Sequence, residues 1–155
     1  MFFAKMMSAT RRYLRDKSGV AAIEFAALGG VMCMLLVVGA DLGMAFYSDM
    51  QVQTSAQAGA EYAAVHGYDA SAVANAVATA TSSSGISSSP APVQFCGCPG
   101  ASGVASATCG TACPDGMSAG TYVTVSATRT YTTLVPYPGF PATYVQNASS
   151  TVRVQ

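Results

Sequence analysis

One histidine and five cysteines are the residues of this 155-residue chain that could carry catalytic or metal chemistry. The histidine, His66, is the base that a serine or cysteine nucleophile would need, and no Ser-His-Asp or Cys-His arrangement can be assembled without it. Gly67 follows it, and a His-Gly pair is typical of a helix end. We therefore interpret His66 as a capping or surface residue, and the sequence predicts that the protein is not an enzyme.

Four of the cysteines, Cys96, Cys98, Cys109 and Cys113, lie close together in a segment rich in glycine, proline, serine and threonine. They contain no Cys-x-x-Cys redox pair, and their spacing departs from the Cys-x2-Cys pairs of zinc knuckles. Disulfides are therefore favoured over zinc. A bridge between Cys96 and Cys98 would close a very tight ring, so we favour the two pairings that join the first pair to the second. Cys33 lies apart in an apolar stretch, where we expect a small buried residue.

Charge is distributed unevenly along the chain. Only 9% of the residues are charged and 51% are hydrophobic, with a formal net charge of zero. Five of the seven basic residues precede residue 18, so the remaining chain has no basic surface for nucleic acid. The basic flank is followed by an almost wholly apolar stretch at residues 20–46. This order is typical of a membrane-targeted segment whose basic flank stays in the cytoplasm.

Two acidic residues, Glu24 and Asp41, interrupt the apolar stretch. As a helix the whole stretch would be ~40 Å long, enough to cross a hydrocarbon core of ~30 Å with some tilt. Both carboxylates would then lie near its edges, where they can reach headgroup water. Three fates fit such a segment: a retained anchor, a secretory signal cleaved after Ala40, or a leader cut on the cytoplasmic side.

The residues Gly19 to Phe25, Gly-Val-Ala-Ala-Ile-Glu-Phe, resemble the cleavage region of type IV-like prepilins. More narrowly, they resemble the TadE-like pseudopilins of tight-adherence (Flp) pilus systems. The alanine-rich block at residues 56–64 is similar to the region that follows the membrane helix in those proteins. Residues 123–125 and 150–154 are similar to their C-terminal strands.

The resemblance implies that a prepilin peptidase cuts after Gly19 and leaves Val20 as the new N-terminus. Glu24 is then expected to meet the free α-amine of Val20 in a neighbouring subunit, and Phe25 to belong to the same assembly segment. Because the abundant Flp subunits are much shorter, the resemblance implies a minor or accessory pseudopilin that serves surface attachment.

The partners that the resemblance implies are the prepilin peptidase, other pilins or pseudopilins, the membrane, and an assembly machine with a separate ATPase. The chain itself has no Gly-x4-Gly-Lys-Ser/Thr phosphate loop. No cofactor, metal or nucleic acid is expected. The expected location is the bacterial inner membrane, crossed once, with a cytoplasmic N-terminus and a periplasmic or extracellular head, or the pilus itself.

Two other functions stay open. A major structural pilin would share the leader and the helix. A secreted or membrane-anchored binding domain without enzymatic activity would instead use a conventional signal peptide, cleaved after Ala40.

The predicted fold is α+β, with a long transmembrane helix that extends into a small antiparallel head with disulfides. It is divided into a basic leader, a transmembrane and stalk helix, a short helix with a Ser/Pro-rich linker, and a β-rich head, at residues 1–19, 20–66, 67–92 and 93–155. Small residues along one face of the stalk helix favour close packing against the head over packing against another subunit. Gly59 is expected to mark that contact, because glycine otherwise weakens a helix.

Smaller elements follow from local patterns. A short helix is predicted at residues 69–80, with Ser71 as a candidate N-cap, followed by a loop or flexible connection at 81–92. Alternating residues predict a strand at 121–135 and a partner strand at 144–154, with a shorter edge strand at 93–96. Prolines at 136, 138 and 141 force a loop between the two long strands.

Overall fold

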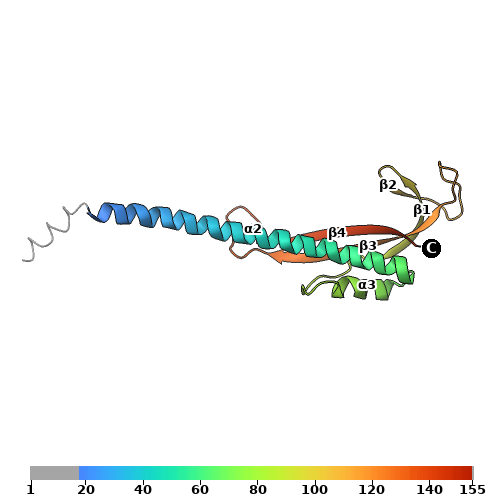
Figure 1. The fold of residues 1–155 in the computed structure, drawn as a ribbon, viewed down its shortest axis with the longest axis horizontal. Coiled ribbons are helices and arrows are strands. Elements are labelled where there is room, and N and C mark those ends of the chain that lie inside the picture. The colour runs from blue at the N-terminus through green and yellow to red at the C-terminus, as the bar shows by residue number, and fades with distance from the viewer. Residues whose placement is uncertain (1–17, 155) are drawn as a thin grey trace, which may run out of the picture. The chain divides into compact units, whose positions relative to one another are not determined.

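The computed structural model describes residues 18–154. Its elements are the helices α2 (Ser18–His66) and α3 (Ala70–Thr79) and the strands β1 (Val93–Gly100), β2 (Gly103–Ser106), β3 (Gly120–Thr132) and β4 (Thr143–Val154) (Figure 1). The chain divides into two units, residues 1–42 and residues 43–155, and each is described by itself below. The fold class is α+β, as the sequence predicts. Most of the basic leader, residues 1–17, lies outside the described residues.

Helix α2 ends where the His-Gly pair predicts. Gly67 adopts a φ of 84°, and its N–H donates a hydrogen bond to the Ala63 carbonyl at 3.0 Å. A left-handed residue after the last helical turn is the usual way to satisfy a terminal carbonyl, and glycine has no Cβ to oppose it.

Helix α3 begins differently from the prediction. Asp69, not Ser71, is the N-cap, and its side chain accepts hydrogen bonds from the N–H groups of Ser71 and Ala72. The Ser71 hydroxyl also donates to the Asp69 carboxylate at 2.7 Å. An aspartate can accept several of these first-turn donors at once, which explains why the cap lies two residues earlier.

The head contains one antiparallel sheet in the order β2-β1-β3-β4. β3 and β4 pair along almost their whole length, from Thr121 with Val154 to Thr132 with Thr143. Two predictions about the sheet are corrected. β1 continues to Gly100 rather than ending at residue 96, and β2, which the sequence did not predict, pairs with its second half from Gly97 to Gly100, whereas residues 93–96 pair with β3. β3 ends at residue 132 rather than 135, before the proline-rich loop.

The missed strand has no hydrophobic alternation that could have revealed it. β1 and β2 read VQFCGCPG and GVAS, and most of their residues are at least partly exposed. Strand patterns come from one buried face, so a hairpin that buries little leaves no such pattern.

The core of the second unit is built from small side chains. α2, α3, the segment at residues 81–92 and the sheet bring together Val52, Ala56, Ala60, Ala63, Val73, Val77, Ile86, Val123, Val125, Ala127 and Val154. A Cβ added to Gly59 would lie 2.5 Å from Val77 Cγ2 and 2.8 Å from Val125 Cγ1. Gly59 therefore marks a close contact between α2, α3 and β3, so the small face packs within the chain.

The segment at residues 81–92 is tied to the sheet. Ser87 exchanges backbone hydrogen bonds with Thr128 of β3 at 3.0 and 2.9 Å, and the Ser88 hydroxyl donates to the Ser126 carbonyl. Ile86 is buried in the core. Of the two alternatives left open for this segment, the structure has an attached loop rather than a flexible connection.

Two buried polar contacts fix the β3–β4 hairpin to α2. The Ser48 hydroxyl donates to Gln146 Oε1 at 2.6 Å, and Gln146 Nε2 donates to the Ala45 carbonyl at 2.9 Å. Because a buried polar side chain is costly unless it is paired, these bonds specify which part of β4 meets the beginning of the second unit.

Candidate functional site

The predicted processing segment lies in the first turns of α2. Gly19 and Val20 are helical, and a Cβ added to Gly19 would have nothing within 4 Å. Val20 and Glu24 are four residues apart and therefore neighbours on one helix face. Glu24 is exposed, and Phe25 is 78% exposed. Within the described chain, no protein core covers the side chains of this segment.

The apolar part of α2 continues this exposed surface. Most of the large apolar side chains among residues 19–42 are exposed: Val20, Ile23, Phe25, Leu28, Val31, Met32, Met34, Leu35, Leu36, Val37 and Leu42. Val38 is half-buried. Cys33 is exposed as well, against the expectation of a buried thiol. Asp41 is 4% exposed, although the sequence places it at a wet edge of the apolar stretch. A helix that is apolar on all sides needs an apolar surrounding.

In the part of the chain that the structure describes, one helix is long and apolar enough to cross a membrane. It lies near the N-terminus of the chain, and none of its most apolar window is buried. This agrees with a single-pass membrane anchor.

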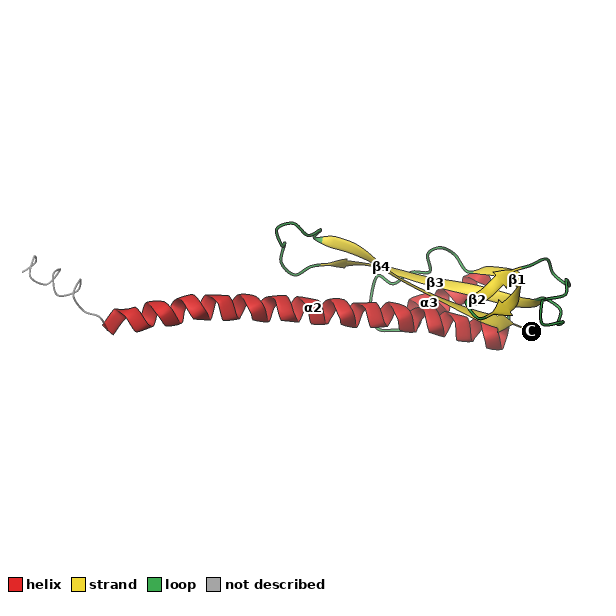
Figure 2. Cartoon of the chain, turned by 90° about the horizontal axis from the view of Figure 1, so that it is seen from above, coloured by secondary structure: helices red, strands yellow, loops and turns green. Residues whose placement is uncertain are grey.

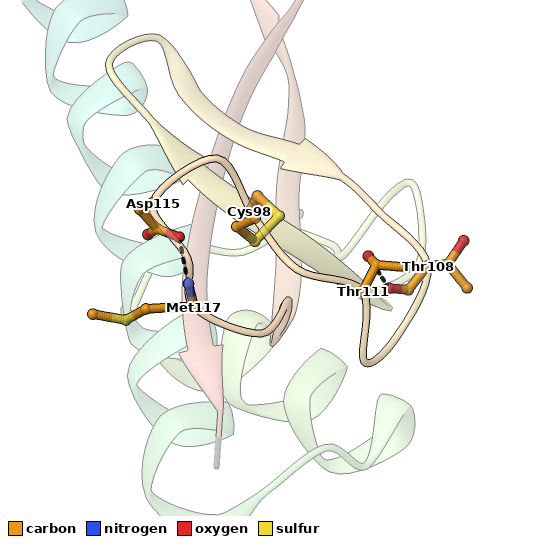
Figure 3. Close-up of a disulfide and its surroundings, with 6 residues drawn as sticks. Cys98, Thr108, Thr111, Asp115 and Met117 are labelled. Atoms are coloured by element: carbon orange, nitrogen blue, oxygen red, sulfur yellow. Dashed lines mark hydrogen bonds between the residues drawn. A yellow bond between two sulfur atoms is a disulfide. The ribbon is translucent and has the colours of Figure 1, made fainter.

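The four clustered cysteines form two disulfides, Cys96–Cys109 and Cys98–Cys113. This is one of the two pairings that the spacing favours, and it uses every thiol that a zinc site would need. The bridges fasten the long segment between β2 and β3 to β1. Figure 3 shows two hydrogen bonds in that segment, from Met117 N–H to Asp115 and from Thr111 Oγ1 to the Thr108 carbonyl, at 3.0 and 2.7 Å.

His66 contacts Tyr62, one turn earlier in α2. Its ring stacks on that of Tyr62 with 4.4 Å between the centroids, and its Nδ1 lies 3.3 Å from the Tyr62 carbonyl oxygen. Among residues 18–154, no group of three or more His, Cys, Asp or Glu side chains could hold a metal ion.

A second exposed apolar region lies between β3 and β4. Leu134, Val135 and Phe140 are exposed there, and Val145 follows them in β4. From the sequence, Leu134 and Val135 are predicted to end the strand at 121–135 and the prolines to form a loop, so this exposed surface is not predicted. The sequence does contain a feature that could have predicted this exposed region, namely apolar residues within a long stretch without charged residues.

An exposed apolar helix joined to a small disulfide-containing α+β head fits the class of membrane-anchored proteins with a single N-terminal span. Within this class, residues 19–61 match the family model described as TadE-like protein. The match begins at Gly19 and runs through the apolar helix into the small-residue face, and it confirms the resemblance to the TadE-like family over these residues. Comparisons with curated proteins and with solved structures found no match.

Proposed function

We propose that the protein is a minor or accessory pseudopilin of a Tad (Flp-type) pilus used for surface attachment. The observation that carries the proposal is the TadE-like match over residues 19–61, which includes the exposed apolar part of α2 and continues into its buried small-residue face. A prepilin peptidase would release the chain after Gly19. α2 would anchor it in the inner membrane and later enter an assembly with other pilins or pseudopilins. A separate cytoplasmic ATPase would supply the energy.

The environment of Gly19 supports a role in processing. Glycine costs a helix ~1 kcal/mol relative to alanine. At Gly59 a close contact within the chain explains that cost, but nothing surrounds Gly19. Gly29, Gly30 and Gly39 are equally open, so openness alone does not select Gly19. The start of the family match at residue 19 supports the choice of Gly19.

Glu24 and Phe25 are the proposed assembly residues. A carboxylate in a membrane span is costly unless it finds a partner. The α-amine that cleavage would create at Val20 of a neighbouring subunit supplies that partner by charge. Phe25, exposed beside it, would contribute apolar contact area to the same junction.

Processing is tested by sequencing the N-terminus of the mature protein from its native host. A mature chain that begins at Val20 is the expected result. Gly19→Leu should block maturation, whereas Gly30→Leu, at an equally open glycine, should be processed normally. A mature chain that begins at Asp41 would replace the proposal with a signal peptide, and an intact Met1 would leave an anchored domain outside the pilin pathway.

Assembly is tested with Glu24→Ala as the sole copy. The Glu24→Ala chain should still be cleaved, but filaments in the sheared fraction should be lost. Glu24→Gln should have the same effect, because glutamine keeps the shape of the glutamate side chain but not its charge. Normal filaments from either variant would refute the proposed role of Glu24.

A further inference from the structure

The loop that joins β3 to β4, residues 133–142, is here called the hairpin loop. It presents large apolar side chains to the outside: Leu134 is 54%, Val135 40% and Phe140 74% exposed. Val145, at the start of β4, is 58% exposed. No charged residue occurs between Arg129 and Arg153. Exposed apolar groups gathered in one uncharged segment usually mark an interaction surface.

The hairpin loop is braced by its own backbone. The Thr133 N–H donates to the Ala142 carbonyl at 2.9 Å, and the Phe140 N–H donates to the Tyr137 carbonyl at 3.2 Å. Prolines at 136, 138 and 141 fix three further φ angles. Because the loop is already ordered, binding through it costs little conformational entropy.

The hairpin loop lies at one particular end of the head. β3 begins beside the disulfide-bonded segment and ends at the hairpin loop, so the two lie at opposite ends of a strand that is ~40 Å long (Figure 2). Gln146, three residues after the start of β4, is hydrogen-bonded to Ala45 and Ser48. These are among the first residues of the second unit. The hairpin loop therefore belongs to the end of the head at which the chain continues into its apolar, membrane-crossing segment.

We infer that the hairpin loop inserts into the interface of the same lipid bilayer that α2 crosses. Its composition fits that partner, because aromatic and aliphatic side chains without charge favour the region between headgroups and acyl chains. The inference rests on α2 as a membrane anchor and not on the assignment to a pilus.

Because α2 already attaches the head to the bilayer, even a weak affinity of the hairpin loop for lipid is sufficient for its insertion. The span holds the head at the bilayer, so insertion of the hairpin loop is an intramolecular event at high effective concentration. Two attachment points, α2 and the hairpin loop, would then restrict the tilt of the head relative to the membrane. The disulfide-bonded segment at the opposite end would be left facing away from the lipid.

The absence of tryptophan from the chain gives a direct test. A single tryptophan is introduced into the full chain by Phe140→Trp, and the variant is reconstituted in vesicles of phosphatidylethanolamine and phosphatidylglycerol with brominated acyl chains. Bromine quenches only tryptophans that reach the lipid. Leu35→Trp in the apolar part of α2 is the positive control. Met117→Trp is the negative control, because Met117 is 65% exposed in the disulfide-bonded segment.

The expected result is strong quenching and blue-shifted emission for Phe140→Trp and Leu35→Trp, and neither effect for Met117→Trp. Val135→Trp is a second reporter in the hairpin loop and should behave like Phe140→Trp. Quenching at Leu35→Trp alone would overturn the inference while leaving the anchor intact. No quenching at Leu35→Trp would overturn both. If the Phe140→Trp emission shifts only in sheared filaments, neighbouring subunits cover the hairpin loop and the inference is wrong.

Discussion

Helix α2 has the same backbone conformation in both units but opposite surfaces. Before residue 42 it carries large apolar side chains, such as Leu28 and Leu35, that are 66% and 60% exposed. Beyond residue 50 its buried face consists mainly of small residues, such as Ala56 and Ala60, packed against α3 and the sheet. Side-chain size thus distinguishes the two regions: large residues where no protein covers the helix, small ones where protein does.

The glycines of α2 make the same distinction. Gly59 allows α3 and β3 to approach the helix, whereas a Cβ added to Gly30 or Gly39 would have nothing within 4 Å. Where helices and strands pack closely, a glycine makes room for the neighbouring side chains because it has no Cβ. A fluid lipid surface does not need such room. The following changes test whether the two regions are stabilised by different surroundings.

The largest effect is expected from removing a disulfide from the head. Cys98→Ser with Cys113→Ser opens a bridge between residues 15 apart, and a loop of that size contributes ~3 kcal/mol to the free energy of unfolding. The measurement is urea unfolding of the full chain in micelles, followed by near-ultraviolet circular dichroism of its tyrosines.

Cys33→Ser is the matched control, because Cys33 is exposed in the first unit. It should leave the unfolding midpoint of the head unchanged. Stoichiometric labelling of the native head by a thiol reagent would contradict the two bridges altogether.

A buried and an exposed residue of α2 should respond differently to truncation. Val52→Ala removes two methyl groups from a side chain that is 0% exposed, which should lower the free energy of unfolding of the head by ~2 kcal/mol. Leu35→Ala removes more atoms from an exposed side chain and should leave that quantity unchanged. If both variants lowered the free energy of unfolding equally in the same urea titration, the stability of the head would depend on the apolar region, and the two regions of α2 would not differ in this respect.

The close contact at Gly59 predicts a smaller decrease in the free energy of unfolding of the head. Gly59→Ala gains helix propensity but forces a methyl group against Val77 and Val125, both fully buried and stiff at χ1, so a net destabilisation of ~1 kcal/mol is expected. Gly43→Ala, in the same unit with open space around it, should be neutral or stabilising. A more stable Gly59→Ala variant would show that the packing around α2 is loose.

The smallest effect is expected at the exposed cap of α3. The Ser71 hydroxyl, followed by the N–H groups of Ala72 and Ser71, lowers the pKa of Asp69. The ionised carboxylate therefore stabilises the folded head at pH values above the unfolded pKa, and this contribution is lost as the pH falls through the lowered folded pKa.

Asp69→Ala should lower the unfolding midpoint slightly at neutral pH. Asp69→Asn keeps an N-cap acceptor but cannot titrate, so it should retain most of the neutral stability and lose less on acidification than the wild type. Unfolding curves at neutral and acidic pH measure both. An acid response of Asp69→Asn identical to that of the wild type would show that Asp69 does not contribute to it.

The sequence by itself determined the features that depend on neighbouring residues. It placed α2 between its basic flank and the glycine at 67, because helix periodicity and end signals are local. It gave the two long strands through their alternation and the disulfide-bonded segment through its cysteine spacing. It also carried the resemblance that the match over residues 19–61 confirms.

Only the tertiary structure decided which partners those elements have. No local sequence pattern specifies these contacts. They include the pairing of Cys96 with Cys109, the pairing of β2 with β1, and the hydrogen bonds of Gln146 to α2. The hairpin loop shows this most clearly. Its apolar residues are visible in the sequence, but the paired strands place them at the end of the head where Gln146 of β4 meets Ala45 and Ser48 of α2, because long-range contacts fix the register of β4 on α2.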